Sequence, residues 1–279
     1  MAISIDVLQL GRITLDGSFL LRGRPPGTLR TVDTRAFLIR GTGIGAILVD
    51  TGFRNRAVIE RLGMGVEMPH GCDVDTQLAR YGTTRSDVGM VILTHLHADH
   101  AGNAHKFANT IPVVVNRREL EFGAGGVQGL FYAPEDMDHM LDRMNAPGAL
   151  TLLDLKDGDS VEIAPGVVCE HAGGHTPGMM FVRIQTDDGL ATICSDVIYD
   201  VRDQLVAPMQ ASRSWEPLVS NNFAVSLEEE KAAIRRALRD TTFLLPSHSR
   251  GARVEHGRVM GLLDGCRIPG PYTPLETVP

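Results

Sequence analysis

Apolar runs along the chain end repeatedly in an acidic residue or a histidine. Five such runs cover residues 45–52, 88–95, 167–175, 190–196 and 241–248. They are short and contain β-branched residues, which is typical of buried strands. In chain order, the polar residues that they deliver are Asp50, His95, His175, Asp196 and His248. The pattern therefore predicts strands that carry potential ligands or catalytic groups at or near their ends.

Helical periodicity and turn signals alternate with these runs. The periodicity predicts helices over residues 54–63, 134–144 and 226–240, the last with Ser226 and Glu229 spaced as a capping box. The apolar face of that helix carries Leu227, Ile234, Ala237 and Leu238, and Arg235, Arg236 and Arg239 lie mostly outside it. Turn dipeptides at 157–158 and 165–166 favour antiparallel hairpins in the middle of the chain. We therefore expect an α/β fold, a two-sheet sandwich flanked by helices.

Composition narrows the class of protein. The 279 residues are 43% hydrophobic and 22% charged, with a net charge of -7, and we expect one domain over residues 1–279. The negative net charge gives no sign of a basic surface that would bind nucleic acid or an anionic membrane. The chain lacks the roughly 20-residue apolar run of a membrane span, and its start lacks the pattern of a signal peptide. These features predict a cytoplasmic enzyme or binding protein.

The cysteines and most of the histidines show no ligand spacing. We expect reduced thiols, three of them buried in strands, at Cys72, Cys169, Cys194 and Cys266. We expect ordinary surface or core residues at His70, His105, His139, His171 and His256.

The stretch LTHLHADHAGN, residues 93–103, is different. His95 and His97 lie two apart, so on an extended segment their side chains point the same way, while Asp99 and His100 follow where a turn or helix begins. Imidazole and carboxylate ligands suit zinc, manganese or iron. Packing these groups together without a metal would crowd polar and like-charged side chains. With His175, Asp196 and His248 the candidate ligands outnumber the needs of one ion, which favours a site for two divalent metal ions.

Four motifs in the same order resemble the metallo-β-lactamase superfamily. They are THLHADHAGN at 94–103, GGHTPG at 173–178, SDVIYD at 195–200 and PSH at 246–248. The resemblance implies an αββα sandwich of two mixed sheets with a dinuclear site at one edge. It implies that one ion is held by His95, His97 and His175, and the other by Asp99, His100 and His248. Asp196 would bridge both ions, and Asp50 would orient ligands from behind.

Individual positions discriminate between branches of that superfamily. The commonest true β-lactamases have a cysteine where Asp196 stands, and the di-iron redox branch has a glutamate at the position of His97. The branch that processes tRNA needs a basic surface to bind RNA, whereas this chain has a net charge of -7. These three branches therefore fit the sequence less well. Tyr199, three residues after Asp196, resembles a tyrosine of the quorum-quenching N-acyl homoserine lactonases. A phenol there can donate to a developing oxyanion, although Tyr199 has the alternative of simple packing at a strand end.

The resemblance implies metal-assisted lactone hydrolysis. Two ions, Zn²⁺ first among Zn²⁺, Mn²⁺, Fe²⁺ and Co²⁺, would lower the pKa of a bridging water toward ~7. The resulting hydroxide would attack the lactone carbonyl while Tyr199 donates to its oxygen and Asp99 accepts a proton. The alternatives are a thioester, ester or amide hydrolase like glyoxalase II, and a catalytically silent member that binds a ligand or partner.

The substrate and the oligomeric state stay open at this stage. Residues 17–29 and 61–71 are apolar segments punctuated by Gly and Pro, and they could cover the site. They would contribute Phe19, Leu20, Leu21, Met64 and Met68 to an acyl pocket. The alternative is that the same residues pack the edge of the fold or a homodimer contact. Arg22 and Arg24 could instead bind the carboxylate of an aromatic lactone acid.

Overall fold

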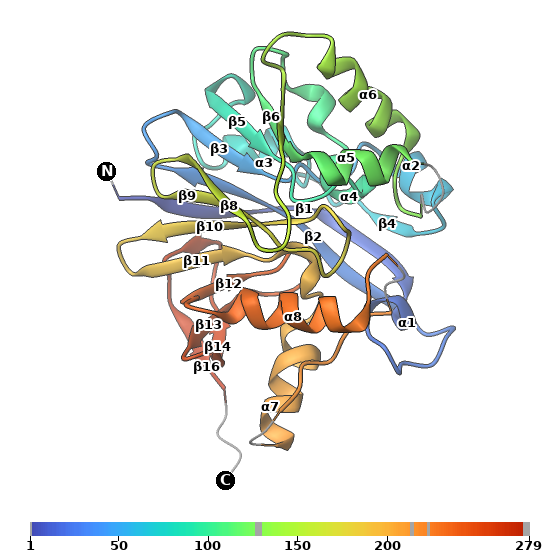
Figure 1. Ribbon diagram of the computed structural model, residues 1–279, viewed down its shortest axis with the longest axis vertical. Helices are drawn as coiled ribbons and strands as arrows, with labels where there is room; N and C mark the ends of the chain where they lie inside the picture. Colours follow the sequence, from blue (N-terminus) through green and yellow to red (C-terminus); the bar gives the residue numbers. More distant parts are fainter. Residues whose placement is uncertain (1, 126–129, 213–214, 222–223, 276–279) are drawn as a thin grey trace.

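A computed structural model describes residues 2–125, 130–212, 215–221 and 224–275 (Figure 1). Two eight-stranded sheets form its centre. The first sheet has the order β15 (Arg267–Ile268), β1 (Ser4–Asp16), β2 (Leu29–Arg40), β3 (Ala46–Val49), β5 (Val88–Ile92), β6 (Val113–Asn116) and β7 (Leu150–Leu153), with β4 (Gly65–Glu67) pairing β1. The second has the order β16 (Tyr272–Pro274), β14 (Arg258–Leu263), β13 (Ala252–Glu255), β12 (Phe243–Leu245), β11 (Gly189–Ile193), β10 (Met180–Thr186), β9 (Val167–His171) and β8 (Ser160–Ala164).

Helices cover the outer face of each sheet. The α-helices are α1 (Gly17–Leu20), α2 (Arg56–Arg61), α3 (Val74–Ala79), α4 (Ala98–Ala101), α5 (Arg117–Ala124), α6 (Pro134–Met144), α7 (Ala207–Ala211) and α8 (Leu227–Leu238). Short 3₁₀ turns occupy Arg85–Asp87, Ala104–Lys106 and Ser195–Val197, and a π-turn occupies Arg202–Val206. In Figure 1, α3, α5 and α6 lie beyond the first sheet and α8 beyond the second. None of the described helices is long and apolar enough to cross a membrane.

The core is layered accordingly. Between the sheets, side chains such as Ile39 and Ile47 of the first pack with Val182 and Ile193 of the second. A second cluster joins the outer face of the first sheet to α3, α5 and α6, and a third joins the second sheet to α8. This burial of two inner and two outer sheet faces confirms the predicted αββα sandwich.

Both sheets are mixed, as expected. In the first, β3, β5, β6 and β7 run parallel, and the other pairs are antiparallel. In the second, only β11 and β12 are parallel among the described pairs. The turns at 157–158 and 165–166 flank β8, and β8 to β11 form the predicted antiparallel hairpins.

The helix predictions are confirmed, with ends shifted by a few residues. At α8, Ser226 Oγ accepts from the backbone N–H of Glu229, whose carboxylate accepts from the Ser226 N–H, so the capping box is formed. Ile234, Ala237 and Leu238 are buried on its apolar face.

One prediction about packing was wrong. Only Cys169 and Cys194 are buried, and Cys194 lies just after β11; Cys72 is partly exposed and Cys266 exposed, all four being free thiols. For Met64 the packing alternative holds, because it lies in a satellite core with Phe53 and Val58. An apolar side chain in a turn-rich segment carries no periodic signal that tells which surface it covers.

Candidate metal centre

Parallel strand pairs bring the candidate ligands to one edge of the sandwich. In the first sheet, β3 ends just before Asp50, and its parallel neighbour β5 leads into the loop with His95 and His97. In the second sheet, the parallel pair β11 and β12 leads to Asp196 and His248. Because parallel strands have their carboxyl ends at the same edge, each pair delivers its polar residues together.

The strands end earlier than the apolar runs suggested. β5 ends at Ile92, three residues before His95, and β9 ends at His171, four residues before His175. The ligand candidates therefore lie on loops and short turns beyond the strands, and the alternation of side chains along a strand does not orient His95 and His97. Loops at this edge also contain Asp50 with φ of 60° and Ser195 with φ of 45°, a left-handed conformation that is uncommon outside glycine and concentrates at functional sites.

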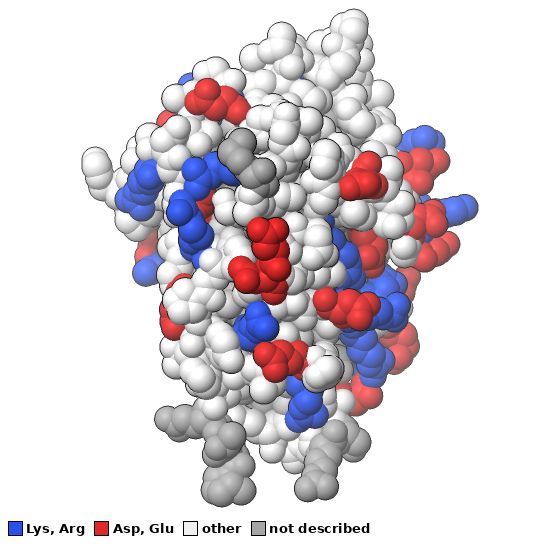
Figure 2. All heavy atoms as spheres, turned by 90° about the vertical axis from the view of Figure 1, so that its left-hand side faces the viewer, with Lys and Arg blue, Asp and Glu red and all other residues white. Residues whose placement is uncertain are grey.

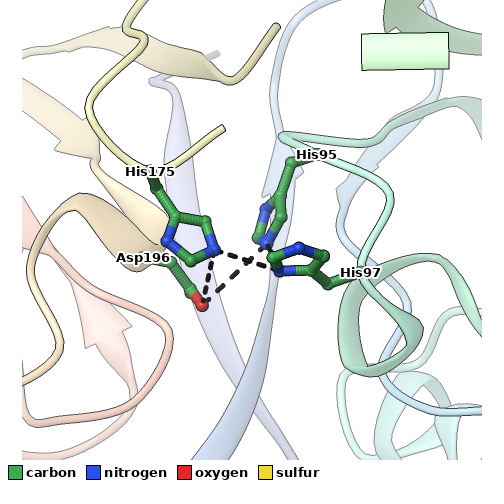
Figure 3. Close-up of side chains that lie close together, drawn as sticks. All are labelled: His95, His97, His175 and Asp196. Atoms are coloured by element: carbon green, nitrogen blue, oxygen red, sulfur yellow. Dashed lines mark hydrogen bonds and ion pairs between the residues drawn. The ribbon is translucent and has the colours of Figure 1, made fainter. Parts of the chain in front are cut away.

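Four of the candidate ligands converge on a common centre (Figure 3). His95 Nε2 and His175 Nε2 lie 3.1 Å and 3.0 Å from His97 Nδ1. Asp196 Oδ2 lies 3.9 Å from His95 Nε2 and 3.7 Å from His175 Nε2. We call His95, His97 and His175 the three-histidine group.

Asp99, His100 and His248 form a second set, which we call the mixed group. His100 Nε2 and His248 Nε2 each lie 3.5 Å from Asp99 Oδ2. Asp196 also reaches this group, with Oδ1 3.2 Å from His100 Nε2 and Oδ2 3.0 Å from His248 Nε2. Asp196 thus lies between the two groups, and the seven residues predicted from the sequence are together at one place, all of them buried.

The geometry fits metal ions. A tetrahedral zinc with ligands at about 2.0–2.1 Å places its ligand atoms about 3.3 Å apart, close to the nitrogen separations in the three-histidine group. In the mixed group, Asp99 Oδ2 is buried without a hydrogen-bond partner among the described residues. A buried polar atom without a partner is costly, and a cation between Asp99 Oδ2 and His100 Nε2 would satisfy it. The cluster is thus a histidine–aspartate metal-binding site.

The two groups differ in their electrostatics. Burial lowers the pKa of His95 and of His97 well below the usual value, and lowers the pKa of His175 to about 4. These imidazoles are therefore neutral, with lone pairs available to a metal. In the mixed group burial opposes protonation, yet nearby carboxylates, first Asp196, raise the pKa of His100 and His248 above the usual value.

Hydrogen bonds behind the mixed group fix its orientation. The Nδ1 of His100 lies 2.9 Å from Asp50 Oδ2, and Asp50 also accepts from the backbone and side chain of Thr94. The Nδ1–H of His248 donates to the carbonyl of Asp33 over 2.6 Å. With Nδ1 protonated, Nε2 of each ring faces the cluster, where a bound cation would displace its proton and take the lone pair. Asp50 thus lies behind the ligands, as the resemblance implied.

Tyr199 lies against both groups. Its ring stacks on His248, with centroids 5.4 Å apart and planes at 19°, and its hydroxyl is 3.3 Å from His175 Nδ1. Burial and the charge of Asp196 raise the pKa of Tyr199 well above its usual value, so the phenol keeps its proton. A strand-end packing role alone would not require the hydroxyl to face the cluster.

The two segments that could cover the site have different surroundings. In residues 17–29, Phe19 makes an edge contact with Phe131 at 6.1 Å, and Phe131 in turn contacts the ring of His97 at 5.7 Å. The side chain of Arg24 pairs with Asp203. In residues 61–71, Met68 is exposed.

Two supporting residues had no recognisable sequence signal. Asp33 acts through its backbone carbonyl, which any residue type could supply. Glu119, fully buried on α5, accepts hydrogen bonds from Leu96 and Thr176 beside the three-histidine group. An isolated glutamate in the first turn of a helix is usually a solvated residue, so only the folded chain identifies it.

Comparison with known proteins agrees with the geometry. The model of the metallo-beta-lactamase superfamily matches residues 29–234. The chain belongs to this superfamily. It is similar to an N-acyl homoserine lactonase of Bacillus cereus, with 31% identity over 201 residues that cover 68% of this chain and 73% of the relative.

Solved structures of the superfamily share the fold. One is a mutant of Bacillus thuringiensis AiiA with N-decanoyl-L-homoserine bound at the active site, with a TM-score of 0.65, 24% identity, and coverage of 85% of this chain and 88% of that chain. Another is AidC, a dizinc quorum-quenching lactonase in complex with a product, with a TM-score of 0.62, 16% identity, and coverage of 99% and 96%. At these identities the likeness shows the superfamily fold alone.

Proposed function

We propose that this protein is a single-domain, metal-dependent hydrolase that opens the ring of N-acyl homoserine lactones or similar small lactones. The observation that carries the proposal is the hydroxyl of Tyr199, 3.3 Å from His175 Nδ1 at a histidine–aspartate metal cluster. The lactonase from Bacillus cereus, at 31% identity, supports this substrate class.

The seven candidate ligands would hold two divalent ions. The three-histidine group would bind one, the mixed group the other, and Asp196 would bridge them. Neutral imidazoles and carboxylates favour zinc among the available metals, with Mn²⁺, Fe²⁺ or Co²⁺ also compatible. When bound, the ions would act as Lewis acids that polarise the lactone carbonyl and make water acidic enough to react near neutral pH.

Tyr199 would position and polarise the substrate. If Nε2 of His175 faces an ion, its Nδ1 carries the proton and donates to the Tyr199 oxygen. The phenolic proton of Tyr199, which otherwise faces Asp196, could then point at the substrate. It would donate to the carbonyl oxygen, more strongly as negative charge develops there.

Asp99 would accept the proton of the attacking water and later return it. Its Oδ2 faces His100 and His248 and would face the ion, so its other carboxylate oxygen could accept the proton that water loses on adding to the carbonyl carbon. When the bond from that carbon to the ring oxygen breaks, Asp99 can return the proton to the ring oxygen. The product is an open-chain hydroxy acid, and no covalent enzyme intermediate is formed.

Surface charge argues against a nucleic acid substrate. Nucleic acid binding depends on a concentrated positive surface, whereas the net charge here is -7. On the face in Figure 2, acidic and basic side chains are interspersed. The nuclease branch of the superfamily therefore fits this chain less well than the lactonase branch.

The test is a substrate panel with metal-loaded protein. Acyl homoserine lactones, aromatic lactones and thioesters would be compared by proton release, with protein stripped by a chelator as the control. We expect ring opening of acyl homoserine lactones that chelation abolishes and zinc restores. Turnover of thioesters alone would overturn the lactonase proposal in favour of a glyoxalase II-like activity.

A further inference from the structure

The carboxylate of Glu119 lies directly behind the three-histidine group. Its side chain is fully buried at the start of α5. Oε1 accepts from the backbone N–H of Leu96 over 3.0 Å, and Oε2 accepts from the hydroxyl of Thr176 over 2.6 Å. Leu96 stands between His95 and His97, and Thr176 follows His175. One carboxylate therefore binds the segments that carry all three histidines.

These two segments come from different sheets. Leu96 belongs to the loop after β5 in the first sheet, and Thr176 to the loop between β9 and β10 in the second. Figure 3 shows the consequence, with His95 and His97 entering from one side and His175 from the other. Glu119 thus ties the two sides of the group together at one point.

Close packing keeps the loop from the second sheet in place. A Cβ at position 178 would collide with the backbone and Cβ of Glu119, so glycine is required there for the approach. The backbone N–H of Gly178 also lowers the pKa of the Glu119 carboxyl. The GHTPG stretch therefore provides His175 as a ligand and Thr176 and Gly178 as the contacts to Glu119.

Tyr132 adds a contact from a further segment. Its hydroxyl donates to Glu119 Oε1 over 2.7 Å, and its ring packs edge-on against His97 with centroids 4.7 Å apart. Burial raises the pKa of Glu119, while the hydrogen bonds from Thr176, Tyr132 and the backbone lower it. All of these partners can donate, which is the arrangement that a buried carboxylate requires.

We propose that Glu119 is a positioning residue that sets the spacing of the three-histidine group, and so controls metal affinity and ligand geometry there without contacting the metal. This inference rests on the proposed function, in which the group binds an ion. A purely structural carboxylate would affect folding alone, whereas a positioning residue also changes how an ion is held in the folded protein.

The test compares metal binding by variants of the full chain. Glu119→Gln keeps the shape and one acceptor but removes the charge. Metal-free protein would be titrated with Co²⁺ in competition with a chelator, and the visible absorption of the bound ion recorded. We expect one of two bound ions to be held about 10- to 100-fold more weakly, the range for lost outer hydrogen bonds to metal ligands, with an altered spectrum for that ion.

A matched pair at position 176 keeps the test valid if Glu119→Gln folds poorly. Thr176→Val removes the hydroxyl with little change of shape, and Thr176→Ser retains it. We expect Thr176→Val to reproduce the weaker Co²⁺ binding and Thr176→Ser to stay near the wild type. Combined with Glu119→Gln, Thr176→Val should add little, because both changes act on the same contact.

Asp6→Asn is the control for general destabilisation. Asp6 is fully buried between Arg40 and Arg267, away from the cluster, in β1. We expect its loss to lower the unfolding temperature but leave the Co²⁺ affinity and spectrum unchanged. Wild-type binding and spectrum in both Glu119→Gln and Thr176→Val would overturn the positioning role alone. Failure of the wild-type protein to bind Co²⁺ would overturn the metal site as well.

Discussion

The three-histidine group and the mixed group lie side by side but differ in their charge and in the hydrogen bonds that support them. In the first, burial keeps three imidazoles neutral, and their nitrogens approach one another to 3.0 Å and 3.1 Å. In the second, a carboxylate and two histidines of raised pKa face each other at 3.5 Å. The first group lacks a negative charge of its own and depends on Asp196 for one, whereas Asp99 supplies one to the second.

The supporting hydrogen bonds differ in the same way. Behind the mixed group, Asp50 and the carbonyl of Asp33 contact the ligand rings directly. Behind the three-histidine group, Glu119 holds the backbone and the neighbouring side chain instead. In the mixed group, hydrogen bonds thus orient the individual imidazole rings, whereas in the three-histidine group they hold the loops that carry the ligands. Mutations can therefore disturb the two groups separately.

Asp196→Ala should have the largest effect, because Asp196 is the residue that both groups share. Its removal takes one carboxylate from each proposed ion and leaves the three-histidine group without negative charge. We expect both ions to be lost on dialysis, and activity to fall by more than the roughly 10- to 100-fold that a supporting hydrogen bond costs. Elemental analysis and lactone turnover measure this. Two retained ions with normal turnover would contradict the bridging assignment.

His97→Ala and His248→Ala should separate the two groups. Each removes one imidazole from one group, so each should leave a protein that binds one ion tightly and the other weakly. Titration of the metal-free variants with Zn²⁺ against a chelator measures the two affinities. Loss of both ions in either variant would show that the groups form a single cooperative site, and the distinction drawn above would fail.

Asp50→Asn should weaken the mixed group alone. The NH₂ group of the asparagine would face either the His100 ring or Thr94, where the aspartate has an acceptor. The negative charge that favours a proton on His100 Nδ1 is also lost. We expect about 10- to 100-fold lower affinity for one ion. Asp136→Asn, a change at a buried carboxylate that pairs with Arg54, is the matched control. Equal effects of the two changes on metal affinity would remove the specific role of Asp50.

The fold could be predicted from the sequence because its signals are local. Apolar runs, the capping box of α8 and the turns around β8 each depend on neighbouring residues, and the structure reproduces them. The burial of Cys266 was predicted wrongly and that of Met64 was left open, because both depend on which distant segment covers the side chain. The ends of β5 and β9 escaped it because an apolar residue beyond a strand continues the same pattern.

The site was predictable only in part, for a related reason. Histidine and aspartate at close spacing mark ligand candidates in a few residues of sequence, and the structure brings all seven together. Glu119 contacts Thr176 across 57 residues of chain, and Asp33 reaches His248 through a carbonyl. Contacts of this kind depend on the tertiary structure, and neither residue type nor spacing in the sequence predicts them.

Tyr199→Phe should have the smallest effect, and it tests whether the two groups share one substrate. The ring stacks on His248 of the mixed group, while the hydroxyl faces His175 of the three-histidine group. Phenylalanine keeps the stacking and removes only the donor. A lost donor to an oxyanion costs up to about a thousandfold where it acts alone. Because bound ions would share the charge here, we expect kcat to fall by only about tenfold.

The distribution of that loss between kcat and KM identifies what the Tyr199 hydroxyl does. A bond that strengthens in the transition state lowers kcat and kcat/KM together, whereas a bond that only holds the substrate raises KM. Metal content and unfolding temperature should not change. Tyr81→Phe, whose hydroxyl bonds to the carbonyl of Val7 over 3.3 Å, is the control. Equal kinetics for Tyr199→Phe and the wild type would leave the metal cluster intact but remove the main structural reason for a lactonase.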